Sequence, residues 1–374
     1  MRASKGVKQR ILQICMLWLT LWVALPVAAH HEPIKVTFLN PGWLNESFWG
    51  DVDNFMQAAA RQLNIDLTIL HGNRDVFRTL EMGERIGRSK QPTDFIILVN
   101  EANTGPRLLE LTAARKIPTI MILSDLTRAQ KQIYGSPREQ FSHWLGSLVP
   151  DNHWVGYHTA RQMHQVMQKA KPDQKRFKWF AISGDTVTPA STLREAGMRD
   201  YVNEHPDIDL VNVVYGEWNE LKATDLARAL LKRSTDIDGI WTANDHMAFG
   251  TIIALDEYGL EPGKDVFIGT VNSSEKVLKY LDEGVISALG AGHFTAGGWA
   301  LLLAYDYSHG YDAMAKQQVL KQSLFDIIQP NTDAFRILRS RDWDQFPIVS
   351  FSRFHNPDWK GYEFSLNPPK KQSR

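Results

Sequence analysis

Aromatic and hydrogen-bonding side chains occur together at several points along this 374-residue chain, each just after a short apolar run. An aromatic face shelters C–H groups from water, while amides, carboxylates and guanidinium groups hydrogen-bond to hydroxyls. Together they are typical of a site for a ligand with many hydroxyls and an apolar face. The segments are 43–49, 71–75, 100–103, 124–125, 186–194, 216–219, 244–245 and 272–274.

The aromatic candidates are Phe48, Trp49 and Trp218. Phe48 and Trp49 stand where a turn meets a helix, so one of the two rings could instead serve helix packing. Trp218 follows a strand in the second half of the chain. It is either the ring that faces Trp49 across a ligand or a surface residue on a loop.

The polar candidates follow strands of the second half. Asp245, beside Asn244, either caps the helix that starts there or accepts hydrogen bonds from two ligand hydroxyls. Arg194 offers donors in a fixed fork, but a surface salt bridge is the alternative, and Thr192 could take its position in the site. Asn272 offers both a donor and an acceptor, although it could equally be a turn residue.

An alternation of strands and helices must position these residues. Apolar β-branched runs alternate with segments of helical periodicity about every 30 residues, which predicts parallel sheets covered by helices. A polar pause at 125–142 divides two such α/β sets and is the expected crossover. The predicted strands are 34–39, 66–70, 95–99, 118–123, 177–182, 210–214, 239–242, 266–269, 285–289 and 324–328. The predicted helices are 49–63, 78–89, 105–115, 152–169, 193–204, 221–232, 246–258, 274–281 and 294–307.

The amino-terminal residues indicate export. Four basic residues precede an apolar run at 11–25 that is too short to span a bilayer, and Val27-Ala28-Ala29 follows it. We therefore expect residues 1–29 to be a signal peptide that is cleaved after Ala29. Because the only cysteine, Cys15, lies within it, the mature chain would have no disulfide, thiolate metal site or cysteine nucleophile.

Composition and the absence of known motifs argue against nucleic-acid binding, a metal site and several classes of enzyme. Removal of residues 1–29 leaves an excess of four acidic residues, so nothing favours nucleic-acid binding. His153, His158 and His164 are spaced too unevenly for one helix face, and we expect neither a metal nor a cofactor. Nucleophile-elbow, zinc-protease and phosphate-loop motifs are absent from the sequence, which favours a protein that is not an enzyme. Paired carboxylates are plentiful, so a glycosidase stays as a remote alternative.

Four stretches resemble the type I periplasmic binding proteins, specifically the ribose/galactose-type sugar-binding branch. Ser47-Phe48-Trp49 resembles the aromatic pair after the first strand, and residues 190–198 (ASTLREAGM) resemble an Arg-x-x-Gly motif. Residues 241–250 (WTANDHMAFG) resemble the Asn-Asp-x-x-Ala-x-Gly motif, and residues 266–274 (VFIGTVNSS) the binding loop near the hinge. The resemblance covers about residues 34–330.

The resemblance implies an α/β fold of two Rossmann-like lobes with parallel sheets, joined by three hinge crossovers and closing over a ligand. It places 33–146 and 292–326 in the first lobe, and 147–291 and 327–330 in the second. Residues 331–374 are then a C-terminal extension to which nothing carries over. Asp125 resembles a charged site position of the family, and the remaining candidates are Glu46 and Asn100.

The function implied is that of a monomeric periplasmic protein that captures a sugar or polyol and delivers it to the permease of an ABC importer. Gene repressors share the fold, but here a signal peptide takes the place of their DNA-binding helices. The alternative is a receptor subunit for a membrane sensor, either a kinase or a cyclase. Quorum-signal receptors resemble the chain around Phe48-Trp49, Arg194 and Asp245, but the second Trp they carry near Val271-Asn272 is absent.

Overall fold

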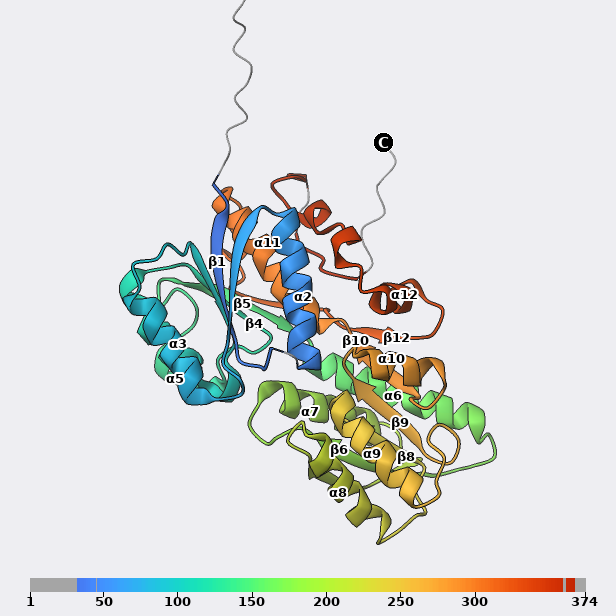
Figure 1. Ribbon diagram of the computed structural model, residues 1–374. Coiled ribbons are helices and arrows are strands. Elements are labelled where there is room, and N and C mark those ends of the chain that lie inside the picture. Colours follow the sequence, from blue (N-terminus) through green and yellow to red (C-terminus); the bar gives the residue numbers. More distant parts are fainter. Residues whose placement is uncertain (1–31, 45, 359–360, 367–374) are drawn as a thin grey trace, which may run out of the picture. The chain divides into compact units, whose positions relative to one another are not determined.

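The computed structural model describes residues 32–44, 46–358 and 361–366, and these residues form two six-stranded sheets (Figure 1). The predicted signal peptide lies outside the described residues. Within them, no helix is long and apolar enough to cross a membrane.

The first sheet has the strand order β11-β5-β4-β3-β1-β2, and all of its pairings are parallel. Its central strands are buried on both faces, as parallel strands covered by helices must be. The strands are β1 (Ile34–Asn40), β2 (Ile65–His71), β3 (Phe95–Leu98), β4 (Thr119–Ile122), β5 (Trp144–Pro150) and β11 (Val319–Gln322). The helices of this lobe are α2 (Ser47–Gln62), α3 (Val76–Arg88), α4 (Gly105–Thr112), α5 (Arg128–Tyr134) and α11 (Ala296–Ser308).

The second sheet has the order β12-β10-β9-β8-β6-β7, in which only β12 runs antiparallel to its neighbour, β10. Its strands are β6 (Phe177–Ser183), β7 (Ile208–Tyr215), β8 (Gly239–Thr242), β9 (Phe267–Val271), β10 (Ala288–Ala291) and β12 (Asp326–Ile328). The helices are α6 (Asn152–Ala170), α7 (Pro189–Asn203), α8 (Glu220–Leu231), α9 (Asp245–Glu257) and α10 (Glu275–Asp282). The predicted two-lobe α/β fold is confirmed.

The chain passes between the sheets three times, after β5, after β10 and between β11 and β12. The expectation of a crossover at 125–142 is wrong, because that segment contains α5 and β5 follows it in the first sheet. Gly146 and Pro150 interrupt the apolar pattern of β5, which explains why the sequence analysis missed it. The short, polar edge strand β11 was missed for a similar reason.

Helices α2 and α11 lie against each other beside the first sheet (Figure 1). A Cβ atom at Gly297 or Gly298 would come within 2.5 Å of Met56 or Phe55, so only glycine allows this close approach. The contact fixes α2, whose amino-terminal turn carries Phe48 and Trp49.

The C-terminal extension is more regular than its sequence suggested. Its described residues, 331–358 and 361–366, include helix α12 (Asp333–Ser340) and two 3₁₀ turns, η4 (Trp343–Gln345) and η5 (Ile348–Phe351). No period stands out in the sequence here, because α12 has only eight residues and the two 3₁₀ turns have three and four. Three more 3₁₀ turns lie earlier in the chain: η1 (Glu101–Asn103), η2 (Ala113–Arg115) and η3 (His293–Thr295).

Candidate functional site

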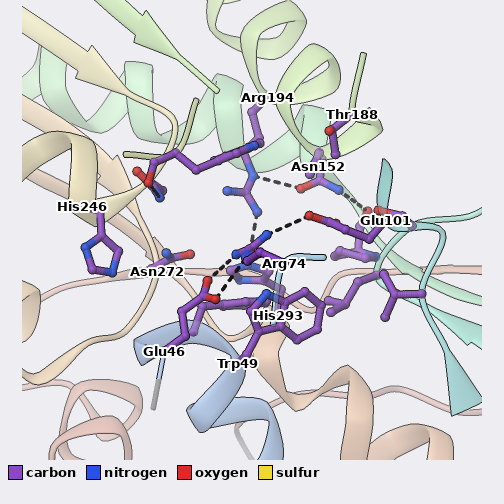
Figure 2. A pocket seen from close by; sticks show the side chains of 18 residues that line it. Glu46, Trp49, Arg74, Glu101, Asn152, Thr188, Arg194, His246, Asn272 and His293 are labelled. Carbon is purple, nitrogen blue, oxygen red and sulfur yellow. Dashed lines mark hydrogen bonds and ion pairs between the residues drawn. The ribbon is translucent and has the colours of Figure 1, made fainter. Parts of the chain in front are cut away.

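A cavity with about 720 Å³ of empty space, its open mouth included, lies where the carboxyl-end loops of both sheets meet (Figure 2). This edge is where ligands bind in open parallel sheets. Seven of the residues proposed from sequence line it: Glu46, Phe48, Trp49, Arg194, Trp218, Asn244 and Asn272.

Aromatic rings form one wall of the cavity. Phe48 meets Trp49 edge to face at a centroid distance of 5.1 Å, and it stacks on His293 at 4.7 Å. Trp49 lies directly over Gly42, where a Cβ atom would come within 2.2 Å of the indole. Trp49 is only 4% exposed, and the Arg74 guanidinium lies 5.9 Å from its ring centroid.

An ion-pair cluster from the first lobe forms a second wall. Arg74 donates from Nε to Glu46 Oε2 (3.0 Å) and from Nη1 to Glu101 Oε1 (2.7 Å), and its Nη2 donates to Glu46 Oε1 (Figure 2). Burial raises the pKa of Glu101, while the nearby charge of Arg74 opposes that rise. Both carboxylates therefore share one cation.

The second lobe contributes a buried guanidinium. Arg194 is 4% exposed and donates from Nε to Asn152 Oδ1 (3.0 Å), from Nη1 to the Ala243 carbonyl (2.8 Å) and from Nη2 to His293 Nε2 (3.1 Å). Burial lowers the pKa of Arg194, and the charge of Asp245 opposes the shift. Burial also lowers the pKa of His293, in keeping with a neutral ring that accepts from Arg194. These bonds hold Arg194 in one orientation.

Asp245 is fully buried behind the cavity wall. Its Oδ1 accepts from Asn272 Nδ2 (2.8 Å), and its Oδ2 accepts from the Ser274 hydroxyl. The cap of α9 is Asn244, which accepts from the Met247 N–H, so Asp245 does not have the capping role considered from sequence. In this structure Asp245 orients Asn272, which lines the cavity.

Trp218 is half-buried and reaches the cavity from the loop after β7. Its Nε1 donates to Asp185 Oδ2 (2.8 Å), and its ring lies over Gly184, where a Cβ atom would be 2.4 Å away. The Arg194 guanidinium lies 5.8 Å from the ring centroid. Trp218 thus has a fixed orientation rather than that of a free surface side chain.

Left-handed backbone is concentrated around the cavity. Four lining residues that are not glycine have positive φ: Arg74 (58°), Leu123 (64°), Trp218 (61°) and Asn272 (114°). Such strain persists only where surrounding structure maintains it, and it is common at binding sites.

Besides Asp245, three other proposed residues do not line the cavity. Asn100 is buried and donates to the Asp125 carbonyl (2.9 Å), and it accepts from the Gly105 N–H (2.8 Å), so it connects loops. Asp125 accepts from Lys131 Nζ and from the Ser147 hydroxyl. Thr192 is exposed on α7.

Several lining residues were not proposed from the sequence and are brought in by the fold. Four polar ones lie in segments already selected as strand-end loops: Arg74, Glu101, Ser124 and Thr188. Asn152 follows the unpredicted strand β5, and His293 follows a crossover, so neither had a local signal. The other polar one is His246. Among the described residues, no group of three or more His, Cys, Asp or Glu side chains could hold a metal ion.

Comparisons with known proteins agree with this architecture. The sequence profile of the family described as "Periplasmic binding protein domain" matches residues 36–312. The galactofuranose-binding protein YtfQ of Escherichia coli (strain K12) is 21% identical over 269 residues, which cover 71% of this chain and 79% of that protein.

Solved structures show the same fold. A periplasmic sugar-binding protein from Pseudomonas fluorescens is 36% identical, with a TM-score of 0.79 over 89% of this chain and 98% of that one. An ABC transporter periplasmic solute-binding protein from Actinobacillus succinogenes 130z with bound D-allose is 18% identical, with a TM-score of 0.67 over 82% and 99%. Because the family profile matches well over half of the chain, this protein belongs to the periplasmic binding protein family.

Proposed function

We propose that this protein binds a neutral sugar or related polyol in the cavity between its lobes and delivers it to an ABC importer. The observation that carries the proposal is the cavity itself, where aromatic rings lie beside hydrogen-bonding groups from both lobes. Apolar contact and directed hydrogen bonds are the two interactions that a sugar ring requires. The sugar-binding relative from Pseudomonas fluorescens, with 36% identity over most of both chains, supports this ligand class.

The charges around the cavity favour a neutral ligand. Glu46 and Glu101 share the single cation Arg74, and the charge of Asp245 acts on Arg194. Asp185, which holds Trp218, adds a further carboxylate. The local charge is therefore negative, and an anionic sugar would be bound at a Coulombic cost. Sugar acids and sugar phosphates should bind much more weakly than the matching neutral sugars.

Binding rather than catalysis fits the two acidic side chains of the cavity. Both Glu46 and Glu101 are hydrogen-bonded to Arg74, so neither is free to act as the proton donor of a glycosidase. The protein would then leave its sugar chemically unchanged. Delivery to an importer is supported by a structural neighbour from Shewanella sp. ANA-3, described as the binding-protein component of an arabinose ABC transporter.

A thermal-shift screen tests the ligand class. The panel contains D-galactose, L-arabinose, D-allose and myo-inositol, with D-glucuronate and D-glucose 6-phosphate as charged controls. A sugar at 100 times its dissociation constant should stabilise the fold by about 2.7 kcal/mol, and calorimetry should then give a 1:1 complex. Stabilisation by the anions instead, or turnover of sugar seen by chromatography, would contradict the proposal.

Export and delivery need a cellular test. Mass spectrometry of the protein from periplasmic extract should give a chain that begins at His30. Deleting the gene should abolish uptake of the radiolabelled sugar found in the screen, and a plasmid copy should restore it. Unchanged uptake with a lost transcriptional response to that sugar would favour a membrane sensor as partner.

A further inference from the structure

The C-terminal extension makes an additional passage between the lobes, beyond the three hinge crossovers. We call the described residues of this extension, 331–358 and 361–366, the C-terminal strap. Its helix α12 packs against α10 and β12 of the second lobe, and the following turns η4 and η5 pack against α2 and α11 of the first (Figure 1). The passage occurs at Arg341, which ends α12 in a left-handed conformation.

The strap is firmly built into the first lobe. Trp343 and Phe346 contact the Phe55 ring of α2, with centroid distances of 5.4 and 5.6 Å. Buried Asp306 of α11 accepts from the Ser352 hydroxyl (2.5 Å) and the Tyr362 hydroxyl (2.6 Å). This part of the strap therefore moves with α2 and α11 as one body.

Arg341 connects both lobes directly. Its Nη1 donates to the Asp51 carboxylate of α2, and its Nη2 donates to the Ser273 carbonyl after β9 (2.7 Å). The Ser273 hydroxyl in turn donates to Asp51 Oδ2 (3.1 Å). Asp51 is only 5% exposed, so its charge depends on these partners.

This cluster lies immediately behind the cavity. Asp51 is one helical turn beyond Phe48, and Ser273 follows Asn272, and both neighbours line the cavity. Moving the lobes apart would separate Asp51 from Ser273. Arg341 would then lose either Asp51 or its second-lobe partners, which are the Ser273 carbonyl and the Glu275 carboxylate (3.7 Å). The cluster is therefore stable only when the two walls of the cavity are together.

We propose that the C-terminal strap favours the closed arrangement of the lobes, with Arg341 as the positioning residue that joins Asp51 to Ser273. The inference rests on the proposed function, because it concerns closure over the same cavity. By making closure less costly in the ligand-free protein, the strap raises the apparent affinity and slows ligand release. Arg341 does this without touching the ligand.

The test compares lobe separation with and without the Arg341 bridge. Removing Arg341 alone would leave Asp51 as an unpaired buried charge, so the principal variant is Asp51→Asn/Arg341→Gln. Arg339→Gln is the matched control, because Arg339 is an exposed residue of the same helix whose guanidinium lies 5.8 Å from the Phe335 ring centroid. Arg341→Lys retains the charge without the fork and serves if the double variant does not fold.

The first readout needs no ligand. Spin labels at Lys90→Cys in the first lobe and Lys232→Cys in the second, in a Cys15→Ser background, report the separation of the lobes by pulsed electron resonance. The distance distribution should become longer and broader in the double variant and to a lesser degree in Arg341→Lys. It should stay as in the wild type in Arg339→Gln. If the distance distributions of both Arg341 variants superimpose on that of the wild type, the proposal is overturned.

The second readout is release of D-galactose, L-arabinose and D-allose by stopped-flow tryptophan fluorescence. The double variant should release the bound sugar about tenfold faster, with a melting temperature close to that of the control. If the lobes of the double variant are further apart but the sugar is released no faster, the proposed effect of the strap on ligand release is wrong. The two proposals can fail separately. If the lobe separation changes as expected but none of these sugars binds the wild type, the proposed function is wrong, while the proposed effect of the strap on closure stands.

Discussion

On the second lobe the cavity is lined by a buried network, whereas on the first lobe it is lined by partly exposed ion pairs. Arg194 and Asp245 are almost completely buried, and each is hydrogen-bonded to neighbours on several elements. In contrast, the Arg74 side chain is 35% exposed, and Glu46 and Glu101 are 19% and 26% exposed. The two halves of one site are thus held by very different interactions.

This difference indicates what each of the two walls contributes to ligand binding. A buried hydrogen-bonded network costs several kcal/mol to disrupt, so the second lobe presents a preformed surface. Partly exposed ion pairs are partly screened by water and contribute less than buried ones, so the first lobe can rearrange its charges at a lower cost when a ligand enters. The second lobe should therefore fix the orientation of the ligand, and the first should adjust to it.

The largest expected effect is that of Arg194→Met. It leaves Asn152, the Ala243 carbonyl and His293 without their donor inside the protein. We expect the free energy of unfolding to fall by about 3 kcal/mol and sugar binding to weaken by more than 100-fold. Urea unfolding and calorimetry measure the two quantities. A variant that is as stable as the wild type would show that the second-lobe wall is not preformed.

Asp245→Asn should have the next largest effect. If Asp245 acts by orienting Asn272, the loss should be about 1.5–3 kcal/mol of binding energy. The variant Asn272→Ala should cost a similar amount, and the two changes together should cost little more than either one. Additive losses in calorimetry would instead mean that Asp245 binds the ligand directly, as first predicted from its sequence motif.

Substitutions of Trp49 and Trp218 test whether the two side chains pack on opposite faces of one sugar ring. Trp49→Ala and Trp218→Ala should each weaken binding by about 1–3 kcal/mol, because each removes apolar contact. The double variant should lose less binding energy than the sum of the two single losses, since packing on one face alone leaves the other face of the sugar exposed to water. If calorimetry shows that both single variants bind like the wild type, Trp49 and Trp218 do not face each other across the ligand.

On the first lobe, Glu101→Gln should change selectivity more than affinity. It removes one negative charge but keeps an acceptor for Arg74, so binding of a neutral sugar should change by about 1 kcal/mol or less. Binding of D-glucuronate should improve relative to D-galactose in competition calorimetry. Glu110→Gln, on the exposed surface of α4, is the control. An unchanged ratio would mean that the ion pairs do not set charge selectivity.

The smallest effect concerns a carboxylate beneath the first-lobe loops. Burial raises the pKa of Asp53 to about 6, although Asn40 Nδ2 donates to it (2.7 Å) and His71 lies 3.4 Å away. Because the folded protein holds this proton more tightly than the unfolded chain, the contribution of Asp53 to stability is greatest at low pH. It declines as the pH rises from about 4 to about 6.

Asp53→Asn should remove that decline. The variant should be more stable than the wild type by about 1 kcal/mol at pH 7.5, and the difference should disappear near pH 4. Urea unfolding across this range measures it. A variant that is less stable at pH 7.5 would show that the charge of Asp53 is needed beside His71.

The sequence was sufficient for those features that depend on local order. Alternating apolar runs of strand length and helical segments led to the two-lobe α/β fold, and the strand-end rule selected most loops that line the cavity. Phe48, Trp49 and Arg194 were found because their neighbours form recognisable motifs. Strands β5 and β11 were missed because pairing with buried neighbours, not a local pattern, makes those residues strands.

Only the tertiary structure decided what each side chain does there. The ion pairs of Arg74 join residues 27 and 28 positions apart, and the bridge from Arg341 to Asp51 spans 290 positions. No local period encodes such contacts, because they depend on how loops of separate strands meet at one edge of a sheet. The same reason places Asp245 behind the wall and Asn272 on it: a motif specifies residue types, but burial and hydrogen-bond geometry assign their positions.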